Sequence, residues 1–461
     1  MNKYMNWEEY TMAFFDEMSL QEILRPEGHD CACGRRHDTG LQFLRVGQGV
    51  INCVPEAIAF MQKKRPFLVA DANTWKAAGE KVAAILDQAG IPYSSYVFPA
   101  SRGHIEPDEQ AVGSITMALD PSCDMLLAVG SGVINDCCRV VAHATGKGHM
   151  VVGTAPSMDG YASNSSSMIV DRIKVSLYAR CPQAIIADVD IMKEAPMRML
   201  FAGVGDMLAK YNAICEWRIS NIATGEFYCE NVARLVRASV KKIMANVDGL
   251  LKRAPEAVHA VAEGLILSGV AMDFAKISRP ASGLEHYFSH LWEMEALRNG
   301  EHADLHGICV GVGLCLSLPM YDALRKHRPT KEEADAAYAA FSQEEWEKEM
   351  REIFAGTADD VIEGEKKWGK NSPEKHGSRL NNLLAHWDEI LQIMDEELPE
   401  TEALIKTMRD IGIPTPPADL DLDDAATRRA FIGSREIRDK YILSSMLWDL
   451  GLLKHPDFLI W

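Results

Sequence analysis

A strand that runs into a glycine turn decides the fold, and it reads Asp124-Met125-Leu126-Leu127-Ala128-Val129-Gly130-Ser131-Gly132. A short, continuous apolar run before a turn is typical of a strand that is buried on both faces. Glycines in such a turn let the backbone approach a pyrophosphate, and the amino end of the next helix favours its charge. The stretch therefore predicts a strand-turn-helix unit of a nucleotide-binding sheet, with a tight turn that holds no ligand as the alternative.

The same alternation of strand and helix extends on both sides of this stretch. We predict strands at 66–71, 92–99, 124–129 and 150–154, and helices at 75–89, at 107–118 and from 133 onward. Strands separated by helices favour right-handed crossovers and a parallel sheet, in which ligands bind at the carboxyl ends of the strands. Asp71, Gly130 and Thr154 fall at such ends, although no GxGxxG follows the first strand. We therefore expect residues 1–192 to form an α/β dinucleotide-binding domain.

The second half of the chain has a different pattern, because the alternation stops after Asp190. We predict an all-helical domain at 193–461 that binds metal and substrate. Asp206 lies in apolar surroundings, where an isolated carboxylate is costly, so it needs a cation. That cation could be Lys210, four residues further on, or a metal. For the charge-dense segment 331–370 we predict solvated helices at the periphery of the protein.

The overall composition excludes several classes of partner. A chain of 461 residues is long enough for two domains, and 47% hydrophobic with 25% charged residues is ordinary for a globular protein. A net charge of −18 argues against nucleic acid and anionic membranes as partners. The 11 scattered cysteines read as reduced thiols, and residues 1–9 show no signal peptide. We expect a cytoplasmic protein without membrane insertion that acts on a small molecule.

One N-terminal cluster has the residue types of a metal site. Cys31-Ala32-Cys33-Gly34 lies between His29 and His37. The second CxxC half of a strong zinc motif is missing, so a turn that carries cysteines is the favoured interpretation, with zinc as the alternative.

Two pairs of histidines give a stronger metal signal. His286 and His290 are four residues apart, which places both imidazoles on one face of a helix, and His302 and His306 repeat this spacing. His306 opens an apolar run, so its imidazole is expected to face a cleft. Neutral imidazoles on two helices can converge on one divalent ion, whereas the alternative is hydrogen-bonded core histidines.

One further stretch is hard to obtain by chance, and it reads Thr154-Ala155-Pro156-Ser157-Met158-Asp159-Gly160-Tyr161-Ala162-Ser163. Together with Asp206 and the histidines it resembles the bacterial glycerol-1-phosphate dehydrogenases. That family belongs to the superfamily of iron-dependent alcohol dehydrogenases and dehydroquinate synthases. The resemblance covers about residues 40–320, with a weaker echo at 433–441.

The resemblance implies a role for each motif. Residues along the cofactor would be Asp71, Gly130, Ser131, Gly132, Asn135, Asp136, Thr154, Ser157 and Ser163. The substrate would contact Asp159, Asp206 and His290, with Asp159 and His290 as catalytic residues. The metal would be held by Asp206, His286 and His306, which leaves His302 as a neighbour.

The implied reaction is a reversible, NAD(P)H- and metal-dependent reduction of dihydroxyacetone phosphate to sn-glycerol 1-phosphate. Zinc suits the ligands, but nickel and iron accept the same donors. Asp71 would accept ribose hydroxyls and repel a 2′-phosphate, so NAD(H) is expected, with NADP(H) left open. Lys210, Arg139 and Lys174 are candidates for the substrate phosphate. We also expect a homo-oligomer, a dimer.

Three other functions compete with this one. A glycerol or other polyol dehydrogenase would share metal and cofactor but lack phosphate recognition. A dehydroquinate synthase-like lyase would recycle its cofactor in each turnover and release no net NADH. A non-catalytic metal-binding or scaffold protein would not need the intact ligand set.

Overall fold

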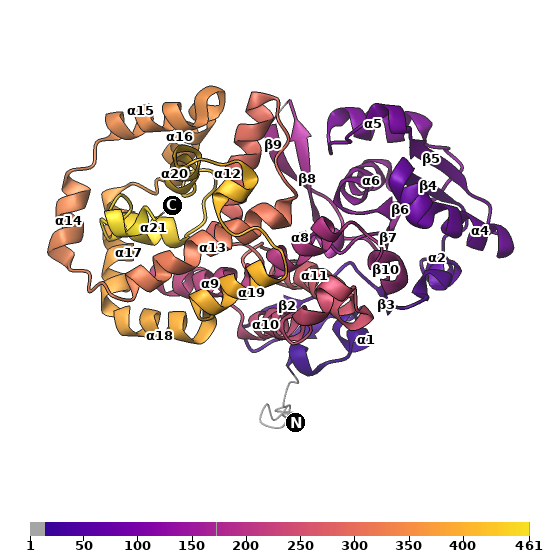
Figure 1. The fold of residues 1–461 in the computed structure, drawn as a ribbon, viewed down its shortest axis with the longest axis horizontal. Coiled ribbons are helices and arrows are strands. Elements are labelled where there is room, and N and C mark those ends of the chain that lie inside the picture. The colour runs from indigo at the N-terminus through magenta and orange to yellow at the C-terminus, as the bar shows by residue number, and fades with distance from the viewer. Residues whose placement is uncertain (1–13, 172, 461) are drawn as a thin grey trace, which may run out of the picture.

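The computed structural model describes residues 14–171 and 173–460, which form a half with a parallel sheet and a helical half (Figure 1). Residues 1–9, for which the sequence analysis predicts no signal peptide, lie outside this range. The predicted class, an α/β region with a parallel sheet followed by a helical region, is confirmed. The division at residue 192 stays a prediction.

A six-stranded parallel sheet forms the centre of the first half. Its strands in spatial order are β3 (Phe43–Gly47), β10 (Ala184–Asp188), β7 (Gly148–Gly153), β6 (Met125–Gly130), β4 (Pro66–Asp71) and β5 (Ser94–Phe98). The strands expected from the sequence are β4 to β7. The neighbours β7, β6 and β4 end side by side, so Thr154, Gly130 and Asp71 share one edge of the sheet, as predicted.

Helices cover both faces of this sheet. They are α2 (Val54–Phe60), α3 (Ala72–Thr74), the π-helical η3 (Trp75–Gly79), α4 (Glu80–Gln88), α5 (Glu109–Ala118) and α6 (Gly132–Thr145), with 3₁₀ turns at η2 (Val50–Cys53) and η4 (Ala100–Arg102). Because side chains alternate along a strand, Leu127 and Val129 belong to a core with α2 and α4. Leu126 and Ala128 belong to the opposite core, with α5 and α6.

Two antiparallel hairpins lie outside the sheet. The hairpin of β8 (Ser165–Val170) and β9 (Ile173–Tyr178) follows the 3₁₀ turn η5 (Gly160–Ala162) and stands between the two halves (Figure 1). The hairpin of β1 (His29–Asp30) and β2 (Arg36–His37) follows η1 (Phe15–Glu17) and α1 (Leu20–Ile23). This N-terminal segment packs on the helical half, where Asp16 pairs with Arg234 at 2.9 Å.

From Val189 onward the described chain is helical. Its α-helices are α7 (Val189–Met192), α8 (Met197–Leu208), α9 (Lys210–Thr224), α10 (Glu230–Met244), α11 (Pro255–Ala275), α12 (Leu284–Asn299), α13 (His306–Leu324), α14 (Lys331–Ala339), α15 (Gln343–Phe354), α16 (Ala358–Trp368), α17 (Pro373–Ala385), α18 (Trp387–Glu397), α19 (Thr401–Asp410), α20 (Asp424–Gly433) and α21 (Leu443–Asp449). Short 3₁₀ turns are η6 (Val247–Lys252), η7 (Ala355–Thr357), η8 (Pro417–Leu420) and η9 (Pro456–Phe458).

Two of these helices, α11 and α13, are long and apolar enough to cross a membrane by length and composition. In both, 83% of the apolar window is buried inside the protein, which is typical of core helices. Both helices pack against α8, so they form the framework on which the candidate site is built.

Candidate active site

Two glycines bring α8 and α13 into backbone contact. A Cβ atom on Gly205 would lie 2.3 Å from the carbonyl oxygen of Gly307, and one on Gly307 would lie 2.0 Å from that of Ala202. Neither position can carry a side chain unless the helices move apart. Asp206 and His306 adjoin these glycines in sequence, so the close crossing holds their side chains near one point.

The carboxylate of Asp206 is fully buried and heavily hydrogen-bonded. Lys210 Nζ donates to its Oδ1 at 2.7 Å and the backbone N of Asp159 donates to its Oδ2 at 2.9 Å, while His286 Nε2 lies 3.6 Å from Oδ1. Burial by itself would raise the pKa of Asp206, but Lys210 and His286 outweigh it and hold the pKa well below its usual value. Asp206 is therefore ionised, and Lys210 is the cation partner that the sequence offered.

Two glutamates orient the histidines at this point. His286 Nδ1 lies 2.8 Å from Glu285 Oε1, and His306 Nδ1 lies 2.8 Å from Glu293 Oε1. A carboxylate accepts a hydrogen bond from the Nδ1–H of its partner, which leaves the Nε2 lone pair of each ring available. The two ring centroids are 5.3 Å apart. Burial and the neighbouring His286 lower the pKa of His306 to about 3, so that imidazole is neutral.

This donor set fits a divalent metal. One ionised carboxylate and two imidazoles, each ring backed by a carboxylate, are the ligands of catalytic zinc sites that keep positions open for substrate. A second grouping shares one of these residues, because ligand atoms of His290, Glu293 and His306 lie within 4.8 Å of one another. Glu293 already accepts hydrogen bonds from His306 and Ser289, so we assign it to orienting His306.

His302 lies apart from this site. Its side chain is exposed, its Nδ1 lies 3.0 Å from Glu106 Oε1, and its ring lies against His104. Of the two spaced pairs in the sequence, the structure thus brings His286, His290 and His306 together and leaves His302 at the surface.

A cavity of about 180 Å³ opens beside His290. The ring centroids of His290 and His306 are 5.6 Å apart, and the cavity is also lined by Lys174 of β9 and by Arg438. Burial, followed by the charges of Arg438 and Lys174, holds the pKa of His290 well below its usual value. Asp360, Val361 and Trp368 of α16 also line the cavity. The expectation that segment 331–370 is peripheral is therefore wrong for α16, because its residues line the cavity beside His290.

The loop after β7 is fastened to the helical half through Asp159. Its Oδ2 accepts hydrogen bonds from Ser268 Oγ at 2.9 Å and from Lys210 Nζ at 2.8 Å. Lys210 thus bridges Asp159 and Asp206. The predicted substrate residue and the predicted metal ligand are held as one unit.

The candidate cofactor residues gather at the carboxyl edge of the sheet. Ser131 Oγ lies 2.7 Å from Ser157 Oγ, and the N of Thr154 donates to Gly130 O at 3.1 Å. Gly132 begins α6 next to them. At the end of β4, Asp71 Oδ1 accepts from the backbone N of Asn73 at 2.7 Å and of Thr74 at 2.9 Å, so Asp71 caps α3.

Other residues assigned to the cofactor have structural partners. Asn135 Nδ2 donates to Gly160 O at 3.2 Å, and its Oδ1 is buried without a hydrogen-bond partner among the described residues. Asp136 pairs with Arg139 at 2.7 Å, and Ser163 Oγ lies 3.1 Å from Ser165 Oγ. Of these contacts, the one between Asn135 and Gly160 holds the loop that follows β7 against α6.

The hydrogen-bond and ion-pair partners of Arg139 and Lys210 narrow the set of cationic side chains that could bind the substrate phosphate. Arg139 is buried and donates to carbonyl groups of the loop, and Lys210 is occupied by two carboxylates. Lys174 faces the cavity, where it pairs with Glu293. Arg438, which sequence reasoning did not name, also faces the cavity; the signal available was its position in the weak echo at 433–441.

Comparisons with known proteins give matches in sequence and in fold. Residues 45–196 match the family model described as "Iron-containing alcohol dehydrogenase". A glycerol-1-phosphate dehydrogenase [NAD(P)+] of Halalkalibacterium halodurans is 29% identical over 90% of this chain and 94% of its own. One of Bacillus velezensis is 34% identical over 61% of this chain and 72% of its own. The crystal structure of glycerol dehydrogenase from Schizosaccharomyces pombe shares the fold, with a TM-score of 0.59 at 15% identity over 91% of this chain and 88% of that one.

Proposed function

Because the chain belongs to the glycerol-1-phosphate dehydrogenase family, we propose that it transfers hydride between NAD(P)H and dihydroxyacetone phosphate to give sn-glycerol 1-phosphate. The resemblance expected from the sequence is thereby confirmed. The observation that carries the proposal is the convergence of Asp206, His286 and His306 from three helices beside a cavity with two cationic side chains.

The metal would be held by these three residues, and zinc suits them best. When bound, a divalent ion supplies Lewis-acid polarisation of the substrate oxygen, and a nicotinamide supplies or accepts the hydride. The protein contributes the orientation. Glu285 and Glu293 fix the rings of His286 and His306, and Lys210 fixes Asp206.

Substrate recognition is assigned to residues around the cavity. Asp159, held by Ser268 and Lys210, would accept hydrogen bonds from substrate hydroxyls. His290 is neutral, so it would share a hydrogen bond with a hydroxyl rather than carry a charge. Lys174 and Arg438 would pair with the phosphate, because charge-assisted hydrogen bonds are the strong way to hold such an anion.

The cofactor would lie along the edge where β4, β6 and β7 end. The turn at Gly130 and Gly132 would admit the pyrophosphate to the amino end of α6. Asp71 uses one oxygen to cap α3, and we assign its carboxylate to the adenosine ribose. That charge would repel a 2′-phosphate, so we propose NAD(H) as the preferred cofactor.

An assay of NADH oxidation tests this proposal. With zinc-loaded protein, dihydroxyacetone phosphate should outperform dihydroxyacetone by about 10⁴-fold, because a site built for phosphate leaves its polar groups unpaired with the smaller substrate. Equal rates would identify a polyol dehydrogenase, and turnover without net NADH consumption would identify a lyase. NADPH in the same assay tests the cofactor preference.

We also propose that the protein is a cytoplasmic homodimer. All eleven cysteines lie in the described part of the chain and none of them forms a disulfide, as expected in a reducing compartment. Light scattering of the purified protein measures the oligomeric state, and a monomeric mass would contradict a dimer.

A further inference from the structure

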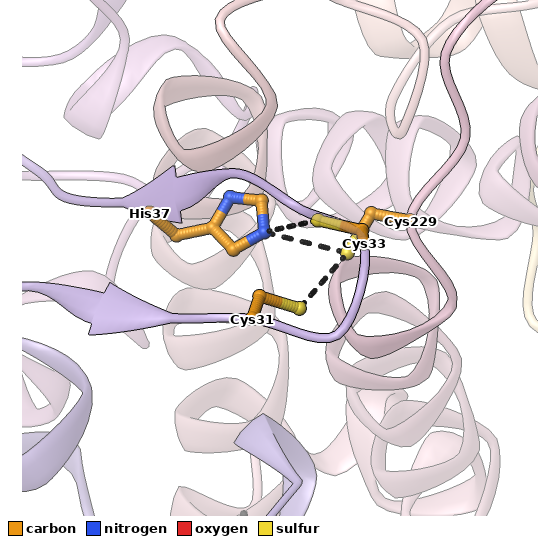
Figure 2. Close-up of side chains that lie close together, drawn as sticks. All are labelled: Cys31, Cys33, His37 and Cys229. Atoms are coloured by element: carbon orange, nitrogen blue, oxygen red, sulfur yellow. Dashed lines mark hydrogen bonds between the residues drawn. The ribbon is translucent and has the colours of Figure 1, made fainter. Parts of the chain in front are cut away.

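A second cluster of metal-type side chains lies outside the active site. Cys31, Cys33 and His37 of the β1–β2 hairpin meet Cys229, the residue that precedes α10, and their side chains point at one another (Figure 2). Their ligand atoms all lie within 4.8 Å of one another. His37 and Cys229 are buried, and Cys31 and Cys33 are half-buried. The preference for a plain turn at Cys31 and Cys33 missed this arrangement, because Cys229 lies far along the chain.

The separations match those of a tetrahedral zinc site. Cys31 Sγ lies 3.7 Å from Cys229 Sγ, and His37 Nε2 lies 3.2 Å from Cys33 Sγ and 3.4 Å from Cys229 Sγ. A tetrahedron with Zn–S of about 2.3 Å and Zn–N of about 2.0 Å places two sulfurs about 3.8 Å apart and sulfur and nitrogen about 3.5 Å apart. In a disulfide, two of the sulfurs would lie about 2.0 Å apart. The three sulfurs and the His37 nitrogen would then no longer surround one common point.

The surroundings support the ligands. His37 Nδ1 lies 2.8 Å from the carbonyl oxygen of Phe274, so Nδ1 donates and Nε2 turns its lone pair to the sulfurs. Asn231 Nδ2 donates to Cys31 Sγ at 3.9 Å. Directly after Cys33, Gly34 has a positive φ of 81° and its N donates to Cys31 O at 3.0 Å, which closes the turn.

We propose that Cys31, Cys33, His37 and Cys229 bind a structural zinc ion that fastens the N-terminal hairpin to α10. All four positions are filled by the protein, which is the mark of a structural site, whereas the active site keeps positions open. Strands of two residues, as in this hairpin, are too short to be stable alone, and a metal supplies the missing free energy. This proposal is independent of the proposed function.

Cobalt substitution tests the site on the intact protein. Cobalt held by three thiolates gives an intense thiolate-to-metal charge-transfer absorption, whereas the Asp206, His286 and His306 set has no sulfur and gives none. We expect this absorption in the wild-type protein and in His306→Ala, and its complete loss in Cys33→Ser. Cys53→Ser, a half-buried cysteine outside the cluster, should keep it.

Zinc content gives the second readout. After dialysis against a chelator that empties the open site, about one zinc ion per chain should remain in the wild type and in Cys53→Ser, and none in Cys33→Ser. If Cys33→Ser does not fold, the wild-type cobalt spectrum decides alone. A wild-type spectrum without the charge-transfer band, or a Cys31–Cys229 disulfide found by mass spectrometry, would overturn the proposal.

Discussion

Oε1 of Glu293 lies 2.8 Å from Nδ1 of His306, and the same oxygen accepts a hydrogen bond from Ser289 at 2.8 Å. The carboxylate thus fixes both the orientation and the tautomer of the ring, because Nδ1 must carry the proton. The Nε2 lone pair of His306 is therefore already available for a metal, and binding does not require the ring to reorient.

Replacing this carboxylate should weaken metal binding without removing a ligand. We expect Glu293→Gln to lower zinc affinity about 10- to 100-fold, because an amide orients and polarises the imidazole less well. Competition with a chromophoric chelator measures the change. Glu295→Gln is the matched control on the same helix, since Glu295 pairs with Arg429 and Arg298. Equal losses in both variants would show that the effect is not specific to His306.

Lys210 should be essential to the stability of the metal-free protein. It is buried and pairs with both Asp159 and Asp206, so Lys210→Met leaves two carboxylates without their cation. Loss of one partner of a buried pair costs about 3–5 kcal/mol, and urea unfolding measures it. Added zinc should restore part of this loss, because the ion supplies positive charge near Asp206. Unchanged stability without metal would contradict the pairing.

The close crossing of α8 and α13 should tolerate no side chain. In Gly205→Ala the new Cβ would meet the carbonyl oxygen of Gly307 at 2.3 Å, which forces the helices apart. We expect a loss of stability of about 1–3 kcal/mol or more, together with weaker zinc binding as Asp206 and His306 separate. Gly113→Ala is the control, because its Cβ would meet nothing within 4 Å. A Gly205→Ala variant as stable as this control would refute the constraint.

Arg438 should act on the phosphate alone. We expect Arg438→Ala to raise KM for dihydroxyacetone phosphate about 10- to 100-fold, the equivalent of a charged hydrogen bond of about 1.5–3 kcal/mol. The slow reaction with dihydroxyacetone should not change. Arg351→Ala, an exposed arginine that pairs with Asp359, serves as control. Equal effects on both substrates would assign Arg438 to folding and not to recognition.

Local patterns predicted the parts of the fold that depend on local burial. The strand at 66–71 was predicted to the residue, because a buried parallel strand is a continuous apolar run. The hairpin that begins at Ser165 is not among the predicted elements, since serines favour turns and only pairing with β9 makes them a strand. The break at Ala209 between α8 and α9 was missed because both sides are helical in pattern.

Prediction of the site from local sequence patterns has the same limit. Asp206, His286, His290 and His306 were recognisable from residue type and spacing, and the structure brings them together. The roles of Glu293 and Arg438 could be recognised only in the folded structure, where α12, β9 and the chain after α20 come together around one cavity. Such contacts join residues distant in sequence, so no local pattern contains them.

The stereochemistry of the product tests the central claim most directly. Dihydroxyacetone phosphate is reduced with NADH by the zinc-loaded protein, and an sn-glycerol 3-phosphate dehydrogenase with excess NAD⁺ is then added to the purified product. We predict that this second enzyme leaves the product untouched, because the product is sn-glycerol 1-phosphate. Full consumption of the product would contradict the account.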